Sequence, residues 1–401
     1  MMQETANANR KHVAFFGKRN AGKSSLFNLL LGEDYSLVSS HLGTTTDPVY
    51  KAMELVGYGP IRLIDTAGLD DIGELGELRV KKSKEVLRKI DMAIYVLDAS
   101  QEITEEEREE AKKLFQRFHI PYVFVWNKRD MIGEILEAEW KSKYPNDVYL
   151  QINPIEKKRQ LVDCIVKQLE LEEEDPSLIG DLVHYGDSVI LVVPIDSEAP
   201  KGRLILPQVQ ILRDCLDHGI KSYVVRDTEL EKALEDLKDV KLVITDSQVF
   251  HRIADMVPLE IPLISFSILF ARQKGELQEF LEGIQVLESL KEKEKAKVLI
   301  VESCSHTQSH EDIGTVKIPN LLRKKLNSKI EIVFQQGRNL EEDLRGIDLI
   351  IHCGSCMLTR KQMLNRIQIA KEQQIPITNY GIVLAYFSGV LERSIKILKG
   401  A

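Results

Sequence analysis

Short apolar runs alternate with helix-like amphipathic stretches along most of this 401-residue chain. In its first part, runs of consecutive apolar residues predict six strands. These strands are Val13–Phe16, Met53–Val56, Ile61–Ile64, Ala93–Leu97, Tyr122–Trp126 and Val148–Leu150. Because helical patterns separate most of these runs, we expect crossover connections and a mostly parallel sheet.

The alternation stops at an acidic stretch, Glu172–Ser177, which is typical of a linker. Beyond it, the same alternation occurs in a middle region and again near the C-terminus. The strands predicted there are Ser188–Ile195, Ser222–Val225, Lys241–Thr245, Ile261–Ser265, Val298–Val301, Ile330–Phe334 and Leu349–Ile351. A charged stretch between the two regions, Gly275–Lys297, predicts an exposed connecting helix. The pattern as a whole predicts an α/β fold of three domains, residues 8–173, 178–266 and 267–401, each with a mostly parallel sheet flanked by helices.

Composition narrows the class of protein. The formal net charge of −8 argues against a large nucleic-acid surface, which is normally basic. No apolar run approaches the ~20 residues that span a bilayer, since the best candidate, Ile261–Ala271, is short and contains serines. The first residues, Met1–Lys11, lack the apolar core of a signal peptide. We therefore expect a cytoplasmic protein that binds neither nucleic acid nor membrane.

The first predicted strand is followed by a loop with the spacing of a phosphate-binding loop, Gly17-Lys18-Arg19-Asn20-Ala21-Gly22-Lys23-Ser24. In such a loop, backbone N–H groups and the N-terminus of the following helix bind phosphate oxygens. Lys23 is then expected to reach the β- and γ-phosphates, and the Ser24 hydroxyl to bind Mg²⁺. The positions that we expect to contact the nucleotide here are Gly17, Asn20, Gly22, Lys23, Ser24 and Ser25.

Three later stretches complete a guanine-nucleotide site. Asp65-Thr66-Ala67-Gly68 follows a strand, where Asp65 can hold Mg²⁺ through water and the Gly68 N–H can sense the γ-phosphate. Asn127-Lys128-Arg129-Asp130 follows another strand, and the Asp130 carboxylate can accept two hydrogen bonds that guanine donates and adenine lacks. Gly43–Asp47 contains Thr45, which can complete the Mg²⁺ shell. The motifs therefore predict binding of GTP or GDP with Mg²⁺.

In this order and spacing the motifs resemble those of the Ras-like GTPases. With Asn20 in the loop, and Leu69 where Ras-type enzymes have a glutamine, the chain is similar to the tRNA-modification and ribosome-assembly GTPases of the TrmE and Era type. The resemblance implies that Asn20 helps to hold a K⁺ ion and that Glu77 positions water. Where that group has a Ser-Ala loop, this chain has Ile152-Asn153-Pro154, which predicts weaker nucleotide binding or base contacts made by the backbone. The catalytic positions implied are Lys23, Thr45, Gly68 and Glu77.

Three of the five cysteines follow predicted strands near the C-terminus. Cys304-Ser305-His306 comes after one strand, and His352-Cys353-Gly354-Ser355-Cys356 comes after another. If these strands are parallel, their carboxyl ends share the edge at which open α/β sheets bind ligands, so the three thiols can converge. Three thiolates, with His306 and His352 nearby, suit either Zn²⁺ or an iron–sulfur cluster, because the C-x-x-C spacing serves both. Cys164 and Cys215 lie in apolar helical patterns, and we expect them to be buried small hydrophobic residues.

This cysteine pattern beside a TrmE-like GTPase resembles the HydF family of FeFe-hydrogenase maturation GTPases. The likeness extends to Asp312-Ile313-Gly314, Lys317-Ile318-Pro319 and Pro376–Gly381, and it covers nearly the whole chain. It implies a homodimer with GTPase, dimerisation and cluster-binding domains.

The same resemblance implies the metal site and the partners. Cys304, Cys353 and Cys356 would ligate a 4Fe-4S cluster with one exchangeable iron, and His306, His352 or the carboxylate of Glu302 would be secondary ligands. A di-iron precursor would be received from radical-SAM maturases and delivered to apo FeFe-hydrogenase. The GTPase motifs alone also allow an RNA-modification or ribosome-assembly GTPase with a structural zinc site, although the acidic composition disfavours it.

Overall fold

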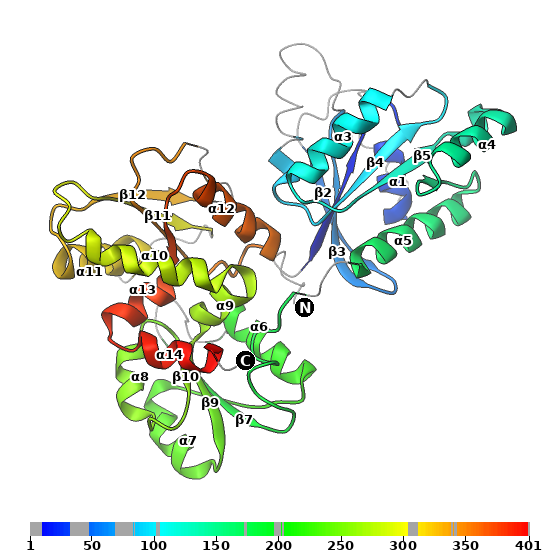
Figure 1. Ribbon diagram of the computed structural model, residues 1–401. Helices are drawn as coiled ribbons and strands as arrows, with labels where there is room; N and C mark the ends of the chain where they lie inside the picture. Colours follow the sequence, from blue (N-terminus) through cyan, green and yellow to red (C-terminus); the bar gives the residue numbers. More distant parts are fainter. Residues whose placement is uncertain are drawn as a thin grey trace. The chain divides into compact units, whose positions relative to one another are not determined.

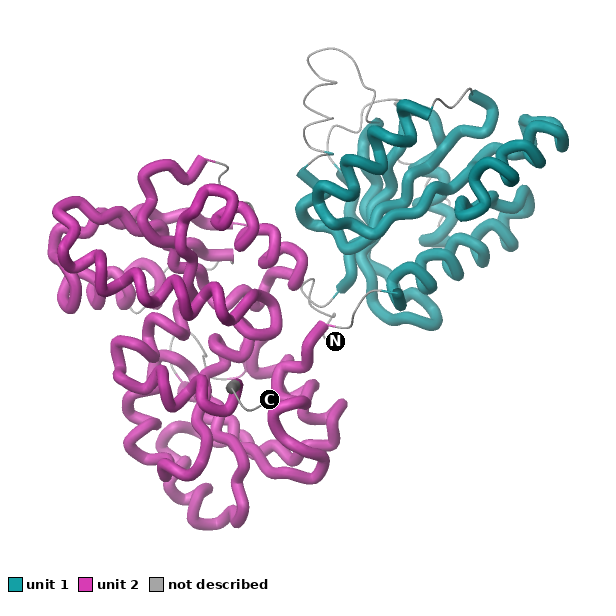
Figure 2. Tube along the Cα trace, viewed as in Figure 1, with its two compact units in different colours: residues 1–174 teal, residues 175–401 magenta. Residues whose placement is uncertain are grey.

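The computed structural model describes residues 10–32, 48–68, 83, 85–101, 105–171, 175–195, 202, 204–303, 312–337, 340 and 343–399. They fall into two compact units, residues 1–174 and 175–401 (Figure 2). Both units are α/β structures built on mostly parallel sheets, as the alternation of apolar and amphipathic stretches predicts.

The first unit contains a six-stranded sheet in the order β2-β3-β1-β4-β5-β6. Its strands are β1 (Lys11–Phe16), β2 (Val49–Leu55), β3 (Gly59–Asp65), β4 (Met92–Asp98), β5 (Tyr122–Asn127) and β6 (Val148–Tyr149). Every pairing in it is parallel except that of β2 with β3. All six predicted strands are present.

Helices cover both faces of this sheet because successive residues of a strand point to opposite sides. Helices among the described residues include α1 (Lys23–Leu31), α3 (Glu105–Arg117), α4 (Glu134–Lys143) and α5 (Pro154–Glu170) (Figure 1). Val13 and Phe15 of β1 belong to the core that α1 and α5 complete. Phe16, one position on from Phe15, belongs to the core on the opposite face, together with Phe115 of α3. The carboxyl end of β1 and the start of α1 are thereby anchored on either side of the glycine loop.

The second unit contains two four-stranded sheets, both entirely parallel, in the orders β10-β9-β7-β8 and β12-β11-β13-β14. The strands are β7 (Ser188–Val192), β8 (Lys221–Val225), β9 (Val240–Thr245), β10 (Leu263–Ser265), β11 (Lys297–Glu302), β12 (Glu331–Gln336), β13 (Leu349–His352) and β14 (Ile377–Asn379). The helices are α6 (Leu206–Asp217), α7 (Leu230–Asp236), α8 (Phe250–Met256), α9 (Phe266–Lys274), α10 (Leu277–Ser289), α11 (Ile318–Lys325), α12 (Arg360–Glu372), α13 (Tyr380–Phe387) and α14 (Leu391–Lys396).

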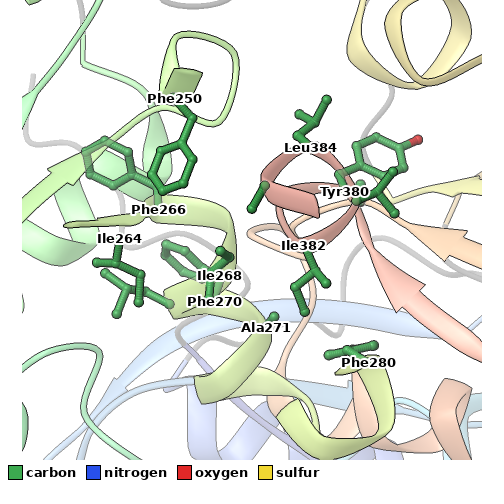
Figure 3. Packing of buried hydrophobic residues seen from close by; sticks show 14 of the residues in the cluster. Phe250, Ile264, Phe266, Ile268, Phe270, Ala271, Phe280, Tyr380, Ile382 and Leu384 are labelled. Atoms are coloured by element: carbon green, nitrogen blue, oxygen red, sulfur yellow. The ribbon is translucent and has the colours of Figure 1, made fainter. Parts of the chain in front are cut away.

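One hydrophobic cluster runs through both sheets of the second unit. Figure 3 shows Phe266 and Phe270 of α9 on one side of this core and Ile382 and Leu384 of α13 on the other. Helix α14 packs against β10, so C-terminal residues cover the sheet of the middle region. The middle and C-terminal regions therefore share a single core, and the groups at their sheet edges can meet.

The prediction of an exposed helix over Gly275–Lys297 was wrong in its extent and its exposure. Helix α10 ends at Ser289 and buries Phe280 and Leu287. At Gly283 it approaches β14 so closely that an added Cβ atom would lie 2.1 Å from the Ile377 carbonyl oxygen. The prediction failed because the charged residues after the helix made the whole stretch look exposed. The apolar face of α10 packs on β14, a three-residue strand that the sequence pattern does not reveal.

Candidate functional site

The phosphate-binding loop lies at the carboxyl end of β1 and has little room for side chains. Gly17 and Gly22 have positive φ angles of +137° and +98°. A Cβ atom on Gly17 would lie 2.4 Å from the Val96 carbonyl oxygen, and one on Gly22 would lie 2.2 Å from Asn127 Nδ2. The backbone of the loop is therefore held directly against β4 and β5.

Lys23, Ser24 and Asp65 meet beneath this loop. The Lys23 Nζ donates hydrogen bonds to the carbonyl oxygens of Gly17 (3.0 Å) and Lys18 (2.7 Å). The Ser24 hydroxyl donates to Asp65 Oδ2 at 2.5 Å. Burial raises the pKa of Asp65, against the hydrogen bond from Ser24 and the charge of Lys23.

The other carboxylate oxygen of Asp65, Oδ1, is buried and has no hydrogen-bond partner among the described residues. A buried carboxylate oxygen without a donor is costly unless a cation or water satisfies it. Magnesium prefers oxygen ligands of this kind and keeps several of its waters. The donor set of Ser24 and Asp65 therefore fits Mg²⁺.

The guanine-recognition motif is tied to the same loop. Asn127 Nδ2 donates to the Ala21 carbonyl oxygen at 3.1 Å. Lys128 Nζ forms an ion pair with Asp98 Oδ2 at 2.7 Å. Burial tends to raise the pKa of Asp98, but hydrogen bonds from Lys128 and Ser100 outweigh it and the pKa is lowered.

Asp130 itself is exposed. The neighbouring Arg129 guanidinium donates to the carbonyl oxygens of Tyr149 (3.1 Å) and Leu150 (2.9 Å), which fixes the motif against the loop after β6. In that loop Asn153 caps α5 by accepting a hydrogen bond from Ile155 N at 2.9 Å, and Ile152 is 60% exposed. The Asn153 side chain is thus used by the helix, and Ile152 presents an apolar side chain to solvent.

Several predicted residues of this site lie outside the described residues, namely Thr45, Leu69 and Glu77. Gly68 is described and buried. Asn20 is exposed and has a positive φ of +62°, a conformation that asparagine tolerates better than most residues.

In the second unit, the described cysteines of the C-terminal pattern lie at the predicted sheet edge. Strands β11 and β13 are parallel neighbours with Val301 opposite His352. The Ser303 backbone N–H consequently donates a hydrogen bond to Cys353 Sγ at 3.3 Å. Cys304, which follows Ser303, and His306 lie outside the described residues. Within the part of the chain that is described, no group of three or more His, Cys, Asp or Glu side chains is placed to hold a metal ion.

Cys353 and Cys356 line a pocket with Glu302, Asp312 and Tyr380. The Tyr380 hydroxyl donates to Glu302 Oε1 at 3.2 Å. Burial and the negative charges of Cys353 and Glu302 raise the pKa of Tyr380, so its phenol stays neutral. Burial also raises the pKa of Cys356 to about 11, so an isolated thiol there is protonated and a bound metal would be needed to hold the thiolate.

His352 is fully buried, and its contacts do not support the predicted role as a metal ligand. Its Nδ1 lies 2.9 Å from the Cys353 carbonyl oxygen and 3.1 Å from the Ser355 hydroxyl, and Arg366 donates to its Nε2. Burial and the charge of Arg366 lower its pKa to about 3, so the ring is neutral. In this arrangement both ring nitrogens have protein partners. His352 thereby orients residues 353–359, the segment between β13 and α12 that we call the cysteine loop.

The opposite wall of the pocket comes from the middle region, where the sequence shows no cluster of candidate site residues. Asp246 and Ser247 follow β9, and Ser267 and Phe270 come from α9. Asp246 and Ser247 lie at the carboxyl end of a parallel strand, where open α/β sheets bind ligands. This position is the one feature of the sequence that could have indicated a site here. Nothing in the sequence indicates that this edge meets the cysteine loop.

The remaining cysteines are structural. Cys215 is fully buried and Cys164 is partly buried. Burial raises the pKa of both thiols to about 11. They are poor nucleophiles and poor metal ligands at neutral pH.

Comparison with known families assigns each region. Residues 178–275 match the hydrogen maturase F dimerization domain, residues 278–397 match the hydrogen maturase F tetramerization domain, and residues 12–128 match the 50S ribosome-binding GTPase family. None of the described helices is both long and apolar enough to cross a membrane.

Individual relatives resemble the GTPase region. The tRNA modification GTPase MnmE of Thermoanaerobacter sp. (strain X514) is 41% identical over 146 residues, which is 36% of this chain and 31% of that protein. MnmE of Aquifex aeolicus (strain VF5) is 40% identical over 120 residues, or 30% of this chain and 26% of that protein. The chain thus spans about a third of the length of these relatives or less. The crystal structure of Aquifex aeolicus Era bound to GDP and aluminium fluoride is 23% identical and covers 54% of this chain and 92% of that chain, with a TM-score of 0.34.

Proposed function

Because the chain belongs to the hydrogen maturase F family, we propose that it is a GTP-hydrolysing scaffold that holds a 4Fe-4S cluster. On it a di-iron precursor is received from radical-SAM maturases and delivered to apo FeFe-hydrogenase. The observation that carries the cluster proposal is the hydrogen bond from Ser303 N–H to Cys353 Sγ, since the residue after Ser303 is Cys304.

Residues of the first unit support the GTPase half of this proposal. The Lys23 ammonium donates hydrogen bonds to the carbonyl oxygens of Gly17 and Lys18 in the loop. When a nucleotide binds, its phosphate oxygens replace these carbonyl oxygens as acceptors. Asp65 and Ser24 hold Mg²⁺, which neutralises charge that develops on the phosphates. Asp130 selects guanine. Asn127 keeps that motif against the loop, and Lys128 ties it to Asp98 at the end of β4.

Potassium activation is part of the proposal. Asn20 is an exposed residue in the middle of the phosphate-binding loop, where its side-chain oxygen is available to a cation beside the phosphates. Hydrolysis should therefore be faster in KCl than in NaCl at equal ionic strength, and Asn20→Ala should abolish the difference. Equal rates in the two salts for the unaltered chain would contradict this role of Asn20.

At the second site, the chemistry of the donors fits an iron–sulfur cluster. Cys353 and Cys356 supply thiolates at one pocket, and Cys304 would supply the third. A 4Fe-4S cluster bound by three cysteines keeps one iron open to an exchangeable ligand. Glu302 lies in this pocket and is the carboxylate nearest in sequence to Cys304, whereas His352 is engaged by Arg366.

The metal content of the protein distinguishes an iron–sulfur scaffold from the alternative, a GTPase with a structural zinc ion. The chain should be purified anaerobically and analysed for iron, sulfide and zinc together with its visible spectrum. We expect a brown protein with iron and sulfide. Cys353→Ser should lose the cluster and keep its GTPase rate, because the P-loop and the cysteines lie in separate compact units. A colourless protein with one zinc per chain would favour the alternative.

Self-association is the expected state, and β8 is the surface that we propose for it. This strand is at the edge of the sheet in the dimerization region, and it exposes Tyr223 and Val224. An exposed apolar edge strand readily pairs with another chain. Val224→Lys should lower the mass measured by sedimentation, whereas the control Ile135→Lys, at an 88% exposed apolar position of the first unit, should not. An unchanged mass for Val224→Lys would exclude β8.

GTP can assist transfer only if it stabilises one partner-binding state over another. We propose that the segments around Thr45 and Gly68 change contacts with a maturase or within the dimer. A coupling of ~1–3 kcal/mol would suffice. Equal affinities for a maturase in GTP and in GDP would exclude this switch.

A further inference from the structure

Two cations are buried beside the cysteine loop, one toward each end. Lys274 and Arg366 are 4% and 3% exposed. At the Cys356 end, Lys274 Nζ donates to the carbonyl oxygens of Cys356 (3.3 Å) and Leu358 (2.7 Å). At the Cys353 end, the Arg366 guanidinium donates to Ser303 Oγ (3.2 Å) and to His352 Nε2.

Neither cation forms an ion pair with a carboxylate of the described residues. All of their hydrogen-bond partners are neutral, including the Gly337 carbonyl oxygen that completes the set for Arg366 at 2.8 Å. By contrast, Arg108 pairs with Asp147 and Arg272 pairs with Asp181. A buried charge without a counter-ion is strongly unfavourable. Such a pair of cations is explained if negative charge is brought to the loop between them.

We propose that Lys274 and Arg366 are the counter-ions of an anionic iron–sulfur cluster on the cysteine loop and that they set its reduction potential. The inference rests on the proposed function for the cluster itself. Each cation acts through the field and through the loop that it holds, without ligating iron. In a poorly solvated site such charges are weakly screened, so they favour the more negative, reduced state.

Lys274 and the cysteines come from different regions of the chain. Lys274 is the last residue of α9 and lies in the region that matches the dimerization domain, whereas the cysteines lie in the next region. The cluster is therefore neutralised by a side chain from a neighbouring domain. A fragment that begins after residue 275 would lack this charge.

The test uses the full-length chain, reconstituted anaerobically with iron and sulfide. The measured step is one-electron reduction by dithionite through redox mediators, with no bond made or broken. Lys274→Met and Arg366→Met should each make the potential more negative, because one positive charge is lost. We expect at least a tenfold change in the reduction equilibrium, which is 59 mV for one electron.

Arg393→Met is the matched control. Arg393 also donates to backbone carbonyl oxygens of the middle region, those of Ala254, Val257, Pro258 and Ile261, but it contacts no residue of the cysteine loop. Its loss weakens packing between the same two regions without changing the charge at the loop. The potential of Arg393→Met should stay at the wild-type value.

The outcomes separate the two proposals. A wild-type chain that binds iron and sulfide, with unchanged potentials in both methionine variants or an equal shift in Arg393→Met, would overturn the counter-ion role alone. A wild-type chain that binds no iron and sulfide would overturn both proposals. If a methionine variant fails to load a cluster, the charge-preserving Lys274→Arg and Arg366→Lys decide. Loading near the wild-type level supports the role of charge, and loading as poor as with methionine contradicts it.

Discussion

Gly22→Ala tests how the phosphate-binding loop is held against β5. The added Cβ would lie 2.2 Å from Asn127 Nδ2, which is the atom that donates to the Ala21 carbonyl oxygen. Gly57→Ala, in the turn between β2 and β3, is the matched control. Its φ angle of +91° is close to the +98° of Gly22, but nothing lies within 4 Å of the added Cβ.

Both variants strain the backbone, but only Gly22→Ala also creates a steric clash. Placing alanine in a left-handed conformation costs roughly 1–2 kcal/mol, and both variants pay it. The clash at Gly22 adds about 1–3 kcal/mol for overpacking. We therefore expect Gly57→Ala to lose about 1–2 kcal/mol of unfolding free energy and Gly22→Ala about 2–5 kcal/mol. Displacement of Asn127 also breaks its hydrogen bond to the Ala21 carbonyl oxygen, which is worth ~1 kcal/mol. Where GDP binding has to restore this arrangement of the loop, GDP binds about fivefold more weakly.

Tryptophan fluorescence during urea unfolding measures the stability of the first unit selectively. Both tryptophans of the chain, Trp126 and Trp140, lie in that unit with their ring centroids 4.3 Å apart. GDP affinity is measured separately by calorimetry. Equal losses of stability in Gly22→Ala and Gly57→Ala, with wild-type GDP affinity in both, would refute the close contact between the loop and Asn127.

Three further predictions address other parts of the molecule. Gly314→Ala should cost about 1–3 kcal/mol in thermal unfolding of the second unit and impair cluster loading, because its Cβ would lie 2.2 Å from both Glu302 Oε1 and the Tyr380 hydroxyl. Gly133→Ala, in the first unit with open space around it, should leave this transition unchanged. Since the pKa of Asp98 is lowered, its ion pair with Lys128 stabilises the fold above pH ~4 and is lost as the pH falls, so Asp98→Asn should flatten the acid limb of the pH–stability curve. Ser24→Ala removes the hydroxyl on Asp65 Oδ2, so its GTPase activity should need more Mg²⁺ than the wild-type enzyme, and an unchanged Mg²⁺ dependence would exclude the site.

Local patterns predicted the phosphate-binding loop and the strand ends that meet it. The loop from Gly17 to Ser24 is consecutive in sequence, and it lies directly between the buried strand β1 and the helix α1. Asp65 and Asn127 each close a strand, so a parallel sheet brings them to the same edge. The edge on which Cys353 lies was predicted by the same reasoning. The spacing did not reveal that Asn153 serves as a helix cap, because a cap depends on where the helix begins.

Sequence by itself determined the alternation of strands and helices, and with it the strand ends at which charged and sulfur-bearing residues gather. Each strand and the residues that follow it are encoded in one short stretch. Only the tertiary structure decided that the middle region forms a wall of the cysteine pocket, that His352 turns inward to Arg366, and that Lys274 reaches the Cys356 loop. These contacts join residues far apart in the chain, and they follow from the core that α9 and α13 share. No local pattern encodes the packing of one sheet on another, because burial of apolar surface is non-directional and many arrangements satisfy it.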